Sequence, residues 1–219
     1  DRSPSRGLGD VYKRQVVITV ARLLFTSRYF DSLADPLDRT AKAKLDQLIG
    51  KGTLFMKQSH SNQVAVVTDH SSIPEADGMV TNNKEIALAV RIADCLPVLM
   101  YSDHAVAAVH VGRKGLLNKV AVNAVVAMKK FGPSPITAVV GPHICGNCYE
   151  VDAQMYEEIV RDHPTTGGKV NYLNLFAGLK AQLPEITFTN LGLCTKENRD
   201  YFSYRSGDLT GRQVGVISL

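Results

Sequence analysis

Hydrophobic and polar positions along the chain follow two periods, which together predict a mixture of strands and helices. Short apolar runs, several rich in β-branched residues, are typical of strands, and they fall at 16–24, 53–56, 64–67, 86–92, 97–101, 105–109, 136–140, 186–191 and 214–217. Apolar residues at spacings of three and four predict helices over 36–49, 115–131, 151–161 and 173–183. Because strands and helices mix without a strict strand–helix–strand rhythm, we expect an α+β fold with mixed β-sheets.

Two of these helices carry boundary signals. For the helix at 36–49, Asp35 can act as N-cap, Pro36 occupies the first position and Gly50 is a stop. The helix at 115–131 begins directly after His110-Val111-Gly112-Arg113-Lys114-Gly115. Its free backbone N–H groups and positive dipole end favour anion binding. The glycines equally predict no more than a tight strand-to-helix turn, and both interpretations stay open.

Composition and charge narrow the class of protein. The chain has 219 residues with 45% hydrophobic content, enough to bury a sizeable core, and we expect a single domain over residues 16–219. Lys and Arg number 25 against 21 Asp and Glu, a small basic excess that suits phosphate-bearing small molecules. The sequence shows no basic stripe with interleaved aromatics, so we expect no nucleic-acid partner. No apolar run approaches the ~20 residues that span a bilayer, so we expect no membrane association.

The N-terminus and the cysteines bear on localisation. Residues 1–15 are rich in Gly, Ser and Arg and lack hydrophobic periodicity, which predicts a disordered or foreign leader. A signal peptide is disfavoured because Arg22 interrupts the following apolar run and no cleavage site follows. Four cysteines in a chain of this length do not predict a secreted disulfide framework, so we expect a cytoplasmic protein. Cys145-Gly146-Asn147-Cys148 lacks a second C-x-x-C, which favours a structural or incidental role, and Cys194 is interpreted as a small buried apolar residue.

Three residues are candidate metal ligands. Cys95 and His110 lie at ends of predicted strands, and His60 lies in a connection between two others. Thiolate and imidazole ligands suit Zn²⁺, and three protein ligands leave the fourth position that catalytic zinc keeps open. The spacing is not that of a zinc finger. The pattern therefore indicates catalysis, with copper as the alternative metal because His and Cys ligands suit it too.

Several neighbouring residues have two interpretations each. Asp94 points away from Cys95 on extended backbone, so it is interpreted as a hydrogen-bond acceptor that orients a histidine, or else as a turn-stabilising residue. Asp77 is interpreted as a turn residue. His143 either touches substrate or is a satisfied structural histidine, and solvent exposure is expected of His70, His104 and His163.

An ordered series of motifs resembles a known family. The motifs are Gln58-Ser59-His60-Ser61, Ala93-Asp94-Cys95, the His110 turn, Gly141-Pro142-His143-Ile144, Tyr149-Glu150-Val151, Phe202-Ser203-Tyr204-Arg205 and Thr210-Gly211-Arg212. From about Lys57 to Leu219 the chain resembles the YfiH-type laccase-domain family, also called polyphenol oxidase or peptidoglycan editing factor. Members of that family include zinc-dependent purine nucleoside phosphorylases.

The resemblance implies a fold, a cofactor and a reaction. The fold is a layered α/β/β/α sandwich, and the cofactor is a zinc ion held by His60, Cys95 and His110. The reaction uses inorganic phosphate to cleave a purine nucleoside into base and ribose 1-phosphate, with adenosine deamination as a further activity. The expected catalytic residues are Cys95, His110 and Asp94, and the expected substrate- or phosphate-binding residues are Arg28, Lys114, His143 and Arg205. Oligomeric state is left open.

Departures from the family pattern keep three alternatives in view. Ser61 stands where the family usually has glycine, Arg113 and Lys114 replace a Trp-Arg pair, and the segment after Arg28 lacks the usual glycines. One alternative is a copper-dependent polyphenol oxidase. A second is a hydrolase with Cys95 as nucleophile and His110 as its base. The third is a catalytically weakened metal-binding protein.

Overall fold

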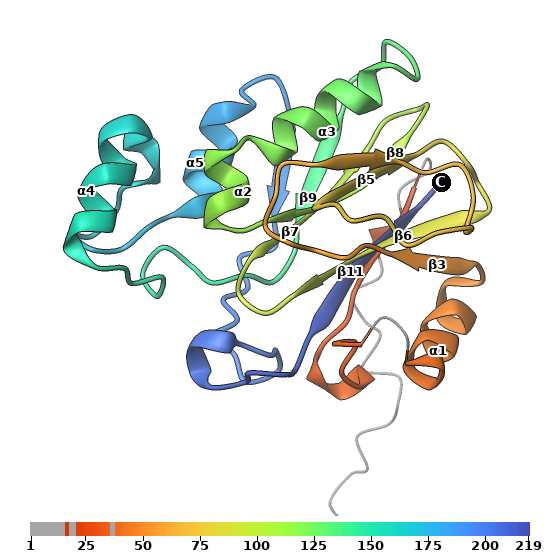
Figure 1. Cartoon of the computed structure of the whole chain (residues 1–219), viewed down its shortest axis with the longest axis horizontal. Coiled ribbons are helices and arrows are strands. Elements are labelled where there is room, and N and C mark those ends of the chain that lie inside the picture. Colours follow the sequence, from red (N-terminus) through yellow and green to blue (C-terminus); the bar gives the residue numbers. More distant parts are fainter. Residues whose placement is uncertain (1–15, 18–20, 36–37) are drawn as a thin grey trace, which may run out of the picture.

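Two β-sheets form the centre of the molecule (Figure 1). The computed structural model describes residues 16–17, 21–35 and 38–219, so the expected leader at 1–15 lies outside the described residues. The first sheet has the order β1 (Val16–Val17), β2 (Arg22–Phe25), β11 (Gln213–Ser218), β6 (Ile86–Ile92) and β3 (Gly52–Phe55). The second has the order β10 (Thr187–Asn190), β9 (Thr137–Val140), β7 (Leu96–Tyr101), β8 (Val106–Val111), β5 (Gly78–Thr81) and β4 (Val64–Val66).

Both sheets mix parallel and antiparallel pairs. In the first sheet β3 runs parallel to β6, whereas β2 and β6 are antiparallel to β11. In the second sheet β10 is parallel to β9 and β4 to β5, and the pairs between β9, β7, β8 and β5 are antiparallel. The prediction of an α+β fold with mixed sheets is therefore confirmed.

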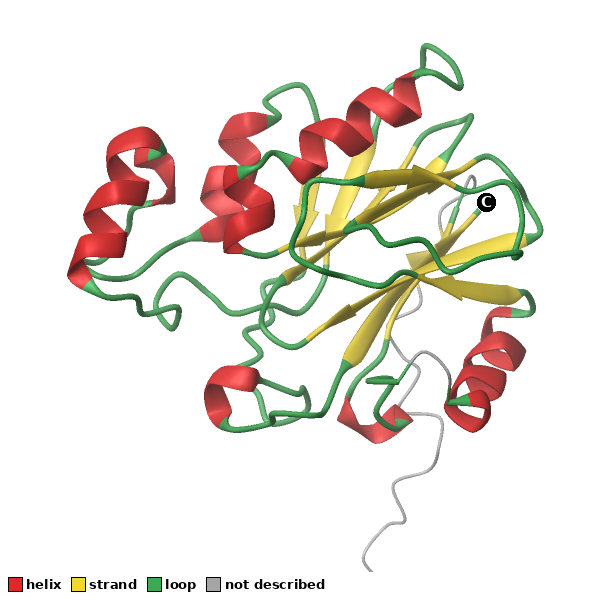
Figure 2. Ribbon diagram, viewed as in Figure 1, coloured by secondary structure: helices red, strands yellow, loops and turns green. Residues whose placement is uncertain are grey.

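Helices cover the outer faces of the two sheets (Figure 2). The helix α1 (Arg39–Ile49) packs on the first sheet. The helices on the other side are α2 (Arg113–Leu117), α3 (Val120–Lys129), α4 (Ala153–Asp162) and α5 (Leu175–Gln182). Alternation along β6 directs Leu88 and Val90 into the layer between the sheets and Ala87 and Ala89 toward α1. Apolar clusters thus fill each interface of an α/β/β/α sandwich.

Local sequence signals predicted the C-terminal end of α1 correctly but not its N-cap. Gly50 ends the helix as predicted, in the left-handed conformation at φ 76. The N-cap is Asp38, whose carboxylate accepts hydrogen bonds from the backbone N–H of Thr40 and Ala41. The prediction of Asp35 as N-cap is wrong, because the carboxylate of Asp38, three residues later, lies next to the first turn of the helix. Pro36 lies outside the described residues.

Two other predicted elements need correction, and one strand was not predicted. The single helix at 115–131 is two helices, because Lys119 takes the left-handed conformation at φ 62 between them. The single strand at 16–24 is two strands that pair antiparallel, with Val16 opposite Leu23. Strand β5 was missed because it is only four residues long and has a glycine and a threonine at its ends, so it forms no apolar run.

Among the described residues, no helix combines the length and the apolar character that crossing a membrane requires.

Candidate metal centre

Strand pairing brings the three predicted ligands to one end of the second sheet. Cys95 immediately precedes β7, and β7 pairs with β8 so that Pro97 lies opposite His110. Val109 and Val111 face the helices, so the alternation of β8 turns His110 toward the space between the sheets. His60 comes from the loop between β3 and β4.

The three side chains are close enough for a common ion. One ligand atom from each of His60, Cys95 and His110 lies within 4.8 Å of the others. The sulfur of Cys95 is 4.0 Å from Nε2 of His60. A sulfur and a nitrogen bound to one zinc, at about 2.3 and 2.1 Å, are separated by at most about 4.4 Å. The arrangement therefore fits a shared metal ion.

One buried carboxylate positions both histidines. Oδ1 of Asp77 lies 2.7 Å from Nδ1 of His110, which leaves Nε2 of that ring for a metal. The same carboxylate accepts hydrogen bonds from the backbone N–H groups of Ser59, His60 and Ser61 and from the Ser61 hydroxyl. Asp77 is fully buried. Its interpretation as a simple turn residue is therefore wrong.

Asp94 has a different set of partners from the one expected. Its carboxylate accepts hydrogen bonds from the hydroxyl of Thr195 at 2.7 Å and the backbone N–H of Arg205 at 2.8 Å. Its backbone sits at φ 89, and this turn directs the side chain to the 194–205 segment. The hydrogen bond that orients a histidine is made by Asp77 instead, so Asp94 anchors the backbone next to Cys95.

Charge pairing prepares the cysteine as a ligand. Burial by itself would raise the pKa of the Cys95 thiol, but the charge and hydrogen bonds of His110 and His60 lower that pKa to about 6. Burial disfavours charge on His110 too, yet the Cys95 thiolate and Asp77 raise its pKa to about 9. Asp77 is itself buried, but hydrogen bonds from His110 and Ser61 hold its pKa well below the usual range. Without metal, the centre is a thiolate beside an imidazolium at neutral pH.

This pairing predicts early thiolate formation at Cys95. In metal-free protein we expect alkylation of Cys95 by iodoacetamide to show a midpoint near pH 6, against about 8.5 for an unperturbed thiol. Peptide mass spectrometry over a pH series measures the extent of reaction. Cys145, whose pKa is raised by burial, is the internal reference. Equal midpoints for the two cysteines would contradict the prediction.

Gly112 makes room for the centre. A Cβ at this position would lie 2.9 Å from the sulfur of Cys95 and 3.0 Å from Cδ2 of His60, closer than van der Waals contact allows. The backbone φ of −85 is ordinary, so glycine is required by space rather than by conformation. The following helix α2 has only five residues before the break, and we assign it no anion site. Gly112 is therefore explained by the close approach of Cys95 and His60 rather than by a tight strand-to-helix turn.

A cavity of about 560 Å³ opens beside the three ligands. Arginine and tyrosine side chains form much of its wall, namely those of Arg91, Arg205, Arg212, Tyr149 and Tyr204. The other lining residues besides the ligands are Ala34, Gln58, Ile92, Ala93, Asp94 and Thr210. Guanidinium groups bind anions, and aromatic rings stack on planar groups. The cavity therefore suits a small molecule that has an anionic part and a planar part.

The three arginines are held by backbone carbonyl groups. Nη1 of Arg205 donates to the Glu150 carbonyl at 2.8 Å, and its guanidinium lies 4.9 Å from the Tyr149 ring centroid. Arg212 donates to the carbonyls of Leu209 and Gly211. Arg91 uses both terminal nitrogens on carbonyls, and its buried Nε has no partner among the described residues. The hydrogen bonds of these guanidinium groups thus go to neutral acceptors, and the charge of Arg91 also interacts with those of Arg212 and Asp35.

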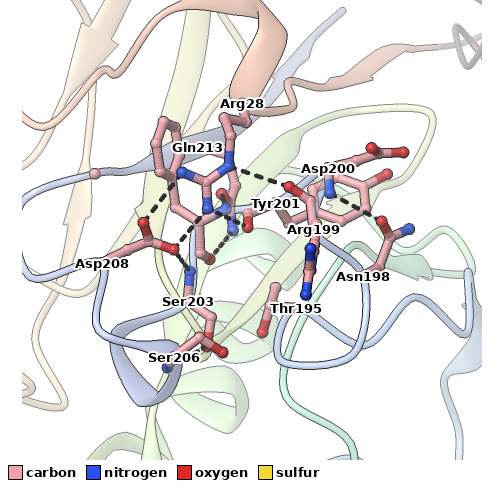
Figure 3. Close-up of polar contacts among 12 residues, drawn as sticks. Arg28, Thr195, Asn198, Arg199, Asp200, Tyr201, Ser203, Ser206, Asp208 and Gln213 are labelled. Carbon is pink, nitrogen blue, oxygen red and sulfur yellow. Dashed lines mark hydrogen bonds and ion pairs between the residues drawn. The ribbon is translucent and has the colours of Figure 1, made fainter.

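Arg28 serves the fold rather than the cavity. Its guanidinium forms two hydrogen bonds to Asp208, at 3.1 and 2.6 Å, and others to the carbonyls of Arg199 and Tyr201 (Figure 3). It also lies 4.5 Å from the Phe202 ring centroid. Since it does not line the cavity, the predicted phosphate contact is not supported, and Arg28 ties the 199–208 segment to the N-terminal part of the first sheet.

This assignment predicts a stability effect without a binding effect. We expect Arg28→Met to lower the free energy of unfolding by about 1 to 2 kcal/mol, because charged hydrogen bonds are lost, and to leave phosphate affinity unchanged. Urea unfolding and isothermal titration with inorganic phosphate measure the two quantities. Arg161→Met is the matched control, since Arg161 forms an ion pair with its exposed neighbour Asp162. Weakened phosphate binding in the Arg28 variant alone would restore the phosphate role.

Two other predicted substrate residues also lie away from the cavity. Lys114 is exposed on α2 and does not line it. His143 is buried, and its Nδ1 lies 2.8 Å from the Gly141 carbonyl oxygen. Burial lowers the pKa of His143, which is typical of a neutral structural histidine. Of the four residues predicted to bind substrate or phosphate, Arg205 is the one that lines the cavity.

Sequence reasoning missed Arg91 and undervalued Arg212 and Asp77. A single arginine near the end of the apolar run 86–92 is a signal that points to Arg91. Arg212 entered the sequence analysis only as part of a motif, and it lines the cavity. No local pattern distinguishes Asp77 from a turn residue, because its partners lie 16 to 33 residues away.

The sequence matches a known family and several named relatives. Residues 38–219 match the family described as multi-copper polyphenol oxidoreductase laccase. A Streptomyces coelicolor protein named purine nucleoside phosphorylase is 38% identical over 180 residues, covering 76% of this chain and 74% of its own. A Corynebacterium glutamicum protein of the same name is 35% identical over 205 residues, covering 86% and 83%.

Solved structures show the same fold. Protein NMB0706 of Neisseria meningitidis aligns with a TM-score of 0.78 at 26% identity, over 93% of this chain and 96% of its own. YlmD of Geobacillus stearothermophilus aligns with a TM-score of 0.79 at 20% identity, over 95% and 98%. With the fold, the ligand cluster and the sequence matches in agreement, this chain belongs to the multi-copper polyphenol oxidoreductase laccase family, the YfiH-like family that the motifs predicted.

Proposed function

We propose that the chain is a zinc-dependent purine nucleoside phosphorylase. The observation that carries the proposal is the opening of the His60, Cys95 and His110 cluster onto a cavity walled by arginine and tyrosine side chains. The names of the relatives from Streptomyces and Corynebacterium agree with this reaction. Phosphate and purine are the two substrate parts that guanidinium groups and aromatic rings recognise.

The residues present fit a zinc ion. Two imidazole nitrogens and one thiolate form a borderline-soft donor set, and Asp77 fixes the ring orientation of His110. Gly112 leaves the space that a Cβ would fill beside the sulfur. When bound, zinc would supply Lewis acidity and keep one coordination position open, which suits phosphorolysis and, as a second activity, adenosine deamination.

The remaining chemistry belongs to the cavity wall. In phosphorolysis a phosphate oxygen forms a bond to the ribose anomeric carbon, the bond to the purine nitrogen breaks, and the base leaves with a proton. We assign phosphate binding to Arg205 and Arg212, because both line the cavity and their guanidinium groups donate to neutral carbonyl groups. The ring of Tyr149, held against Arg205, offers a face on which a purine can stack.

Product analysis tests the proposal. Purified protein is incubated with adenosine or inosine, with and without phosphate, after chelator treatment and after zinc is restored. We expect adenine or hypoxanthine together with ribose 1-phosphate only when zinc and phosphate are both present. Phosphate-independent conversion of adenosine to inosine reports the deaminase activity. Absence of all these products in zinc-loaded protein would overturn the proposed function.

Substitutions of Arg205 and Lys114 should have different effects on the KM for phosphate in the same assay. We expect Arg205→Ala to raise the KM for phosphate about 10-fold or more, because a charge-assisted contact of about 1.5 to 3 kcal/mol is lost. Lys114→Ala is the matched control, since that lysine is exposed and does not line the cavity. An equal response of both variants would contradict the assignment.

Copper oxidation is the second candidate, favoured by the family description. Two histidines and one cysteine also match a mononuclear copper site. Multicopper chemistry needs further histidine clusters, whereas among the described residues the one metal-competent group that contains histidine is His60, Cys95 and His110. Metal analysis of protein prepared without added copper distinguishes the two hypotheses. Stoichiometric bound copper together with oxidation of phenols would favour the copper oxidase over the zinc enzyme.

A metal-free hydrolase is the third candidate, favoured by the lowered pKa of Cys95. Zinc binding would occupy the same sulfur, so we expect zinc to protect Cys95 from alkylation. Unprotected alkylation accompanied by ester hydrolysis would support the hydrolase instead.

A further inference from the structure

We propose that Cys145, Cys148, Cys194 and Glu197 form a second metal site, which binds a structural zinc ion. One ligand atom from each residue lies within 4.8 Å of the others. The sulfurs of Cys145 and Cys148 are 3.7 and 3.2 Å from the same oxygen of Glu197. Three soft sulfur donors and one carboxylate give the four ligands of a closed, tetrahedral zinc site. The first centre, by contrast, offers three.

The backbone around Cys145 has the shape that such a site needs. The N–H groups of Cys148 and Tyr149 both donate to the Cys145 carbonyl, which curls the C-x-x-C segment into a tight turn. Gly146 passes close to Asn174, where a Cβ would lie 2.9 Å from the asparagine Cβ. The N–H of Cys145 donates to the sulfur of Cys194 at 3.3 Å. This contact holds the Cys194 sulfur beside the C-x-x-C turn.

The composition of this cluster favours a cation. Three thiol groups and one carboxylate lie close enough together to share one ion. A divalent cation would relieve the repulsion among these four potential anions, and it would bind the cysteines as thiolates.

The second site lies behind the wall of the first. Cys194 is followed by Thr195, whose hydroxyl donates to Asp94, and Cys145 follows Ile144, whose N–H donates to the Asp94 carbonyl. Cys148 is followed by Tyr149, which lines the cavity. A metal ion would therefore cross-link the two segments that hold Asp94 on either side. We infer that it stabilises the cavity wall without touching substrate.

Metal stoichiometry in the full chain tests this site independently of the proposed function. Under reducing conditions we expect about two zinc ions per chain in the wild type and about one in His60→Ala, which removes a ligand of the first centre. Adding Cys148→Ser to His60→Ala should sharply weaken the remaining binding, because the closed four-ligand site loses one of its sulfurs. Elemental analysis and native mass spectrometry give the ratios.

The absorption spectrum of bound Co²⁺ identifies the ligand atoms. In His60→Ala, Co²⁺ should give the intense sulfur-to-metal charge-transfer absorption of a tetrahedral thiolate site. Glu197→Gln should weaken Co²⁺ and Zn²⁺ binding. Because Glu197 is exposed, this variant should fold even if Cys148→Ser does not, and it then tests the site in its place. Glu157→Gln, an exposed acid on α4, is the matched control and should bind normally.

Two results would overturn the second site. One is a folded His60→Ala protein that binds neither zinc nor cobalt. The other is unchanged binding in both the Cys148→Ser and the Glu197→Gln variants. A further expected readout is that zinc raises the melting temperature of His60→Ala and that Cys148→Ser removes the rise.

Discussion

Replacing Asp77 with asparagine is expected to lower zinc affinity about 10- to 100-fold and to destabilise the metal-free fold by about 3 kcal/mol. The carboxylate bonds to Nδ1 of His110 and receives four hydrogen bonds from the 59–61 loop. An amide has no negative charge for the imidazolium, and its NH₂ group would face donors. Both histidines would therefore lose their orientation at once.

Chelator competition measures the zinc affinity, and urea unfolding in the presence of chelator measures the stability. Asp46→Asn is the matched control, because Asp46 accepts hydrogen bonds from Thr53 far from the metal centre. We expect this control to lose stability and to keep its zinc affinity. Unchanged affinity in the Asp77 variant would show that Asp77 does not position the ligands.

Acid should reduce the difference between the wild type and Asp77→Asn. The folded-state pKa of Asp77 is held below its ordinary value, so its stabilisation is fully present above the unfolded-state pKa of about 3.9. It is lost as pH falls through the lower folded-state pKa. Unfolding free energies of the two metal-free proteins should therefore converge on acidification.

Replacing Gly112 with alanine is expected to lower zinc affinity about 10- to 100-fold with a much smaller loss of stability. The added Cβ would lie 2.9 Å from the sulfur of Cys95, and neither that sulfur nor the His60 ring can withdraw while both bind one ion. Because metal–ligand distances tolerate only about 0.2 Å, displacement of either group should open the site. Isothermal titration with zinc measures the effect.

Gly168→Ala is the control for this substitution. At Gly168 a Cβ would meet only the Tyr172 carbonyl oxygen, at 3.8 Å, which is ordinary contact. Metal binding and unfolding should both stay close to wild type there. If Gly112→Ala binds zinc normally, the ligands have more freedom than the structure indicates, and the space argument fails.

Much of the fold could be predicted because its signals are local. The apolar run at 86–92 corresponds to β6, and Gly50 ended a helix by its own conformational preference. The ends of other elements depended on neighbours. The carboxylate of Asp38 displaced Asp35 as a cap, and Lys119 broke a continuous apolar pattern. Strand β5 left no pattern, because its four residues begin with glycine and end with threonine and so form no apolar run.

Some residues of the metal centre could likewise be predicted from the sequence, and others could not. His60, Cys95 and His110 could be selected because imidazole and thiolate are rare groups with a defined metal chemistry. Asp77, Arg91 and Arg212 are common residue types, and only their positions at one end of the sheets make them part of the site.

The sequence by itself determined the class of fold through local periodicity, the family through an ordered series of motifs, and three candidate donor groups through side-chain chemistry. Only the tertiary structure decided which residues join them. The order β7, β8, β5 brings Asp77 to His110 across 33 residues, and loop packing brings Cys194 to Cys145 across 49. Strand order depends on which faces are buried together, a property of the whole chain that no short segment contains.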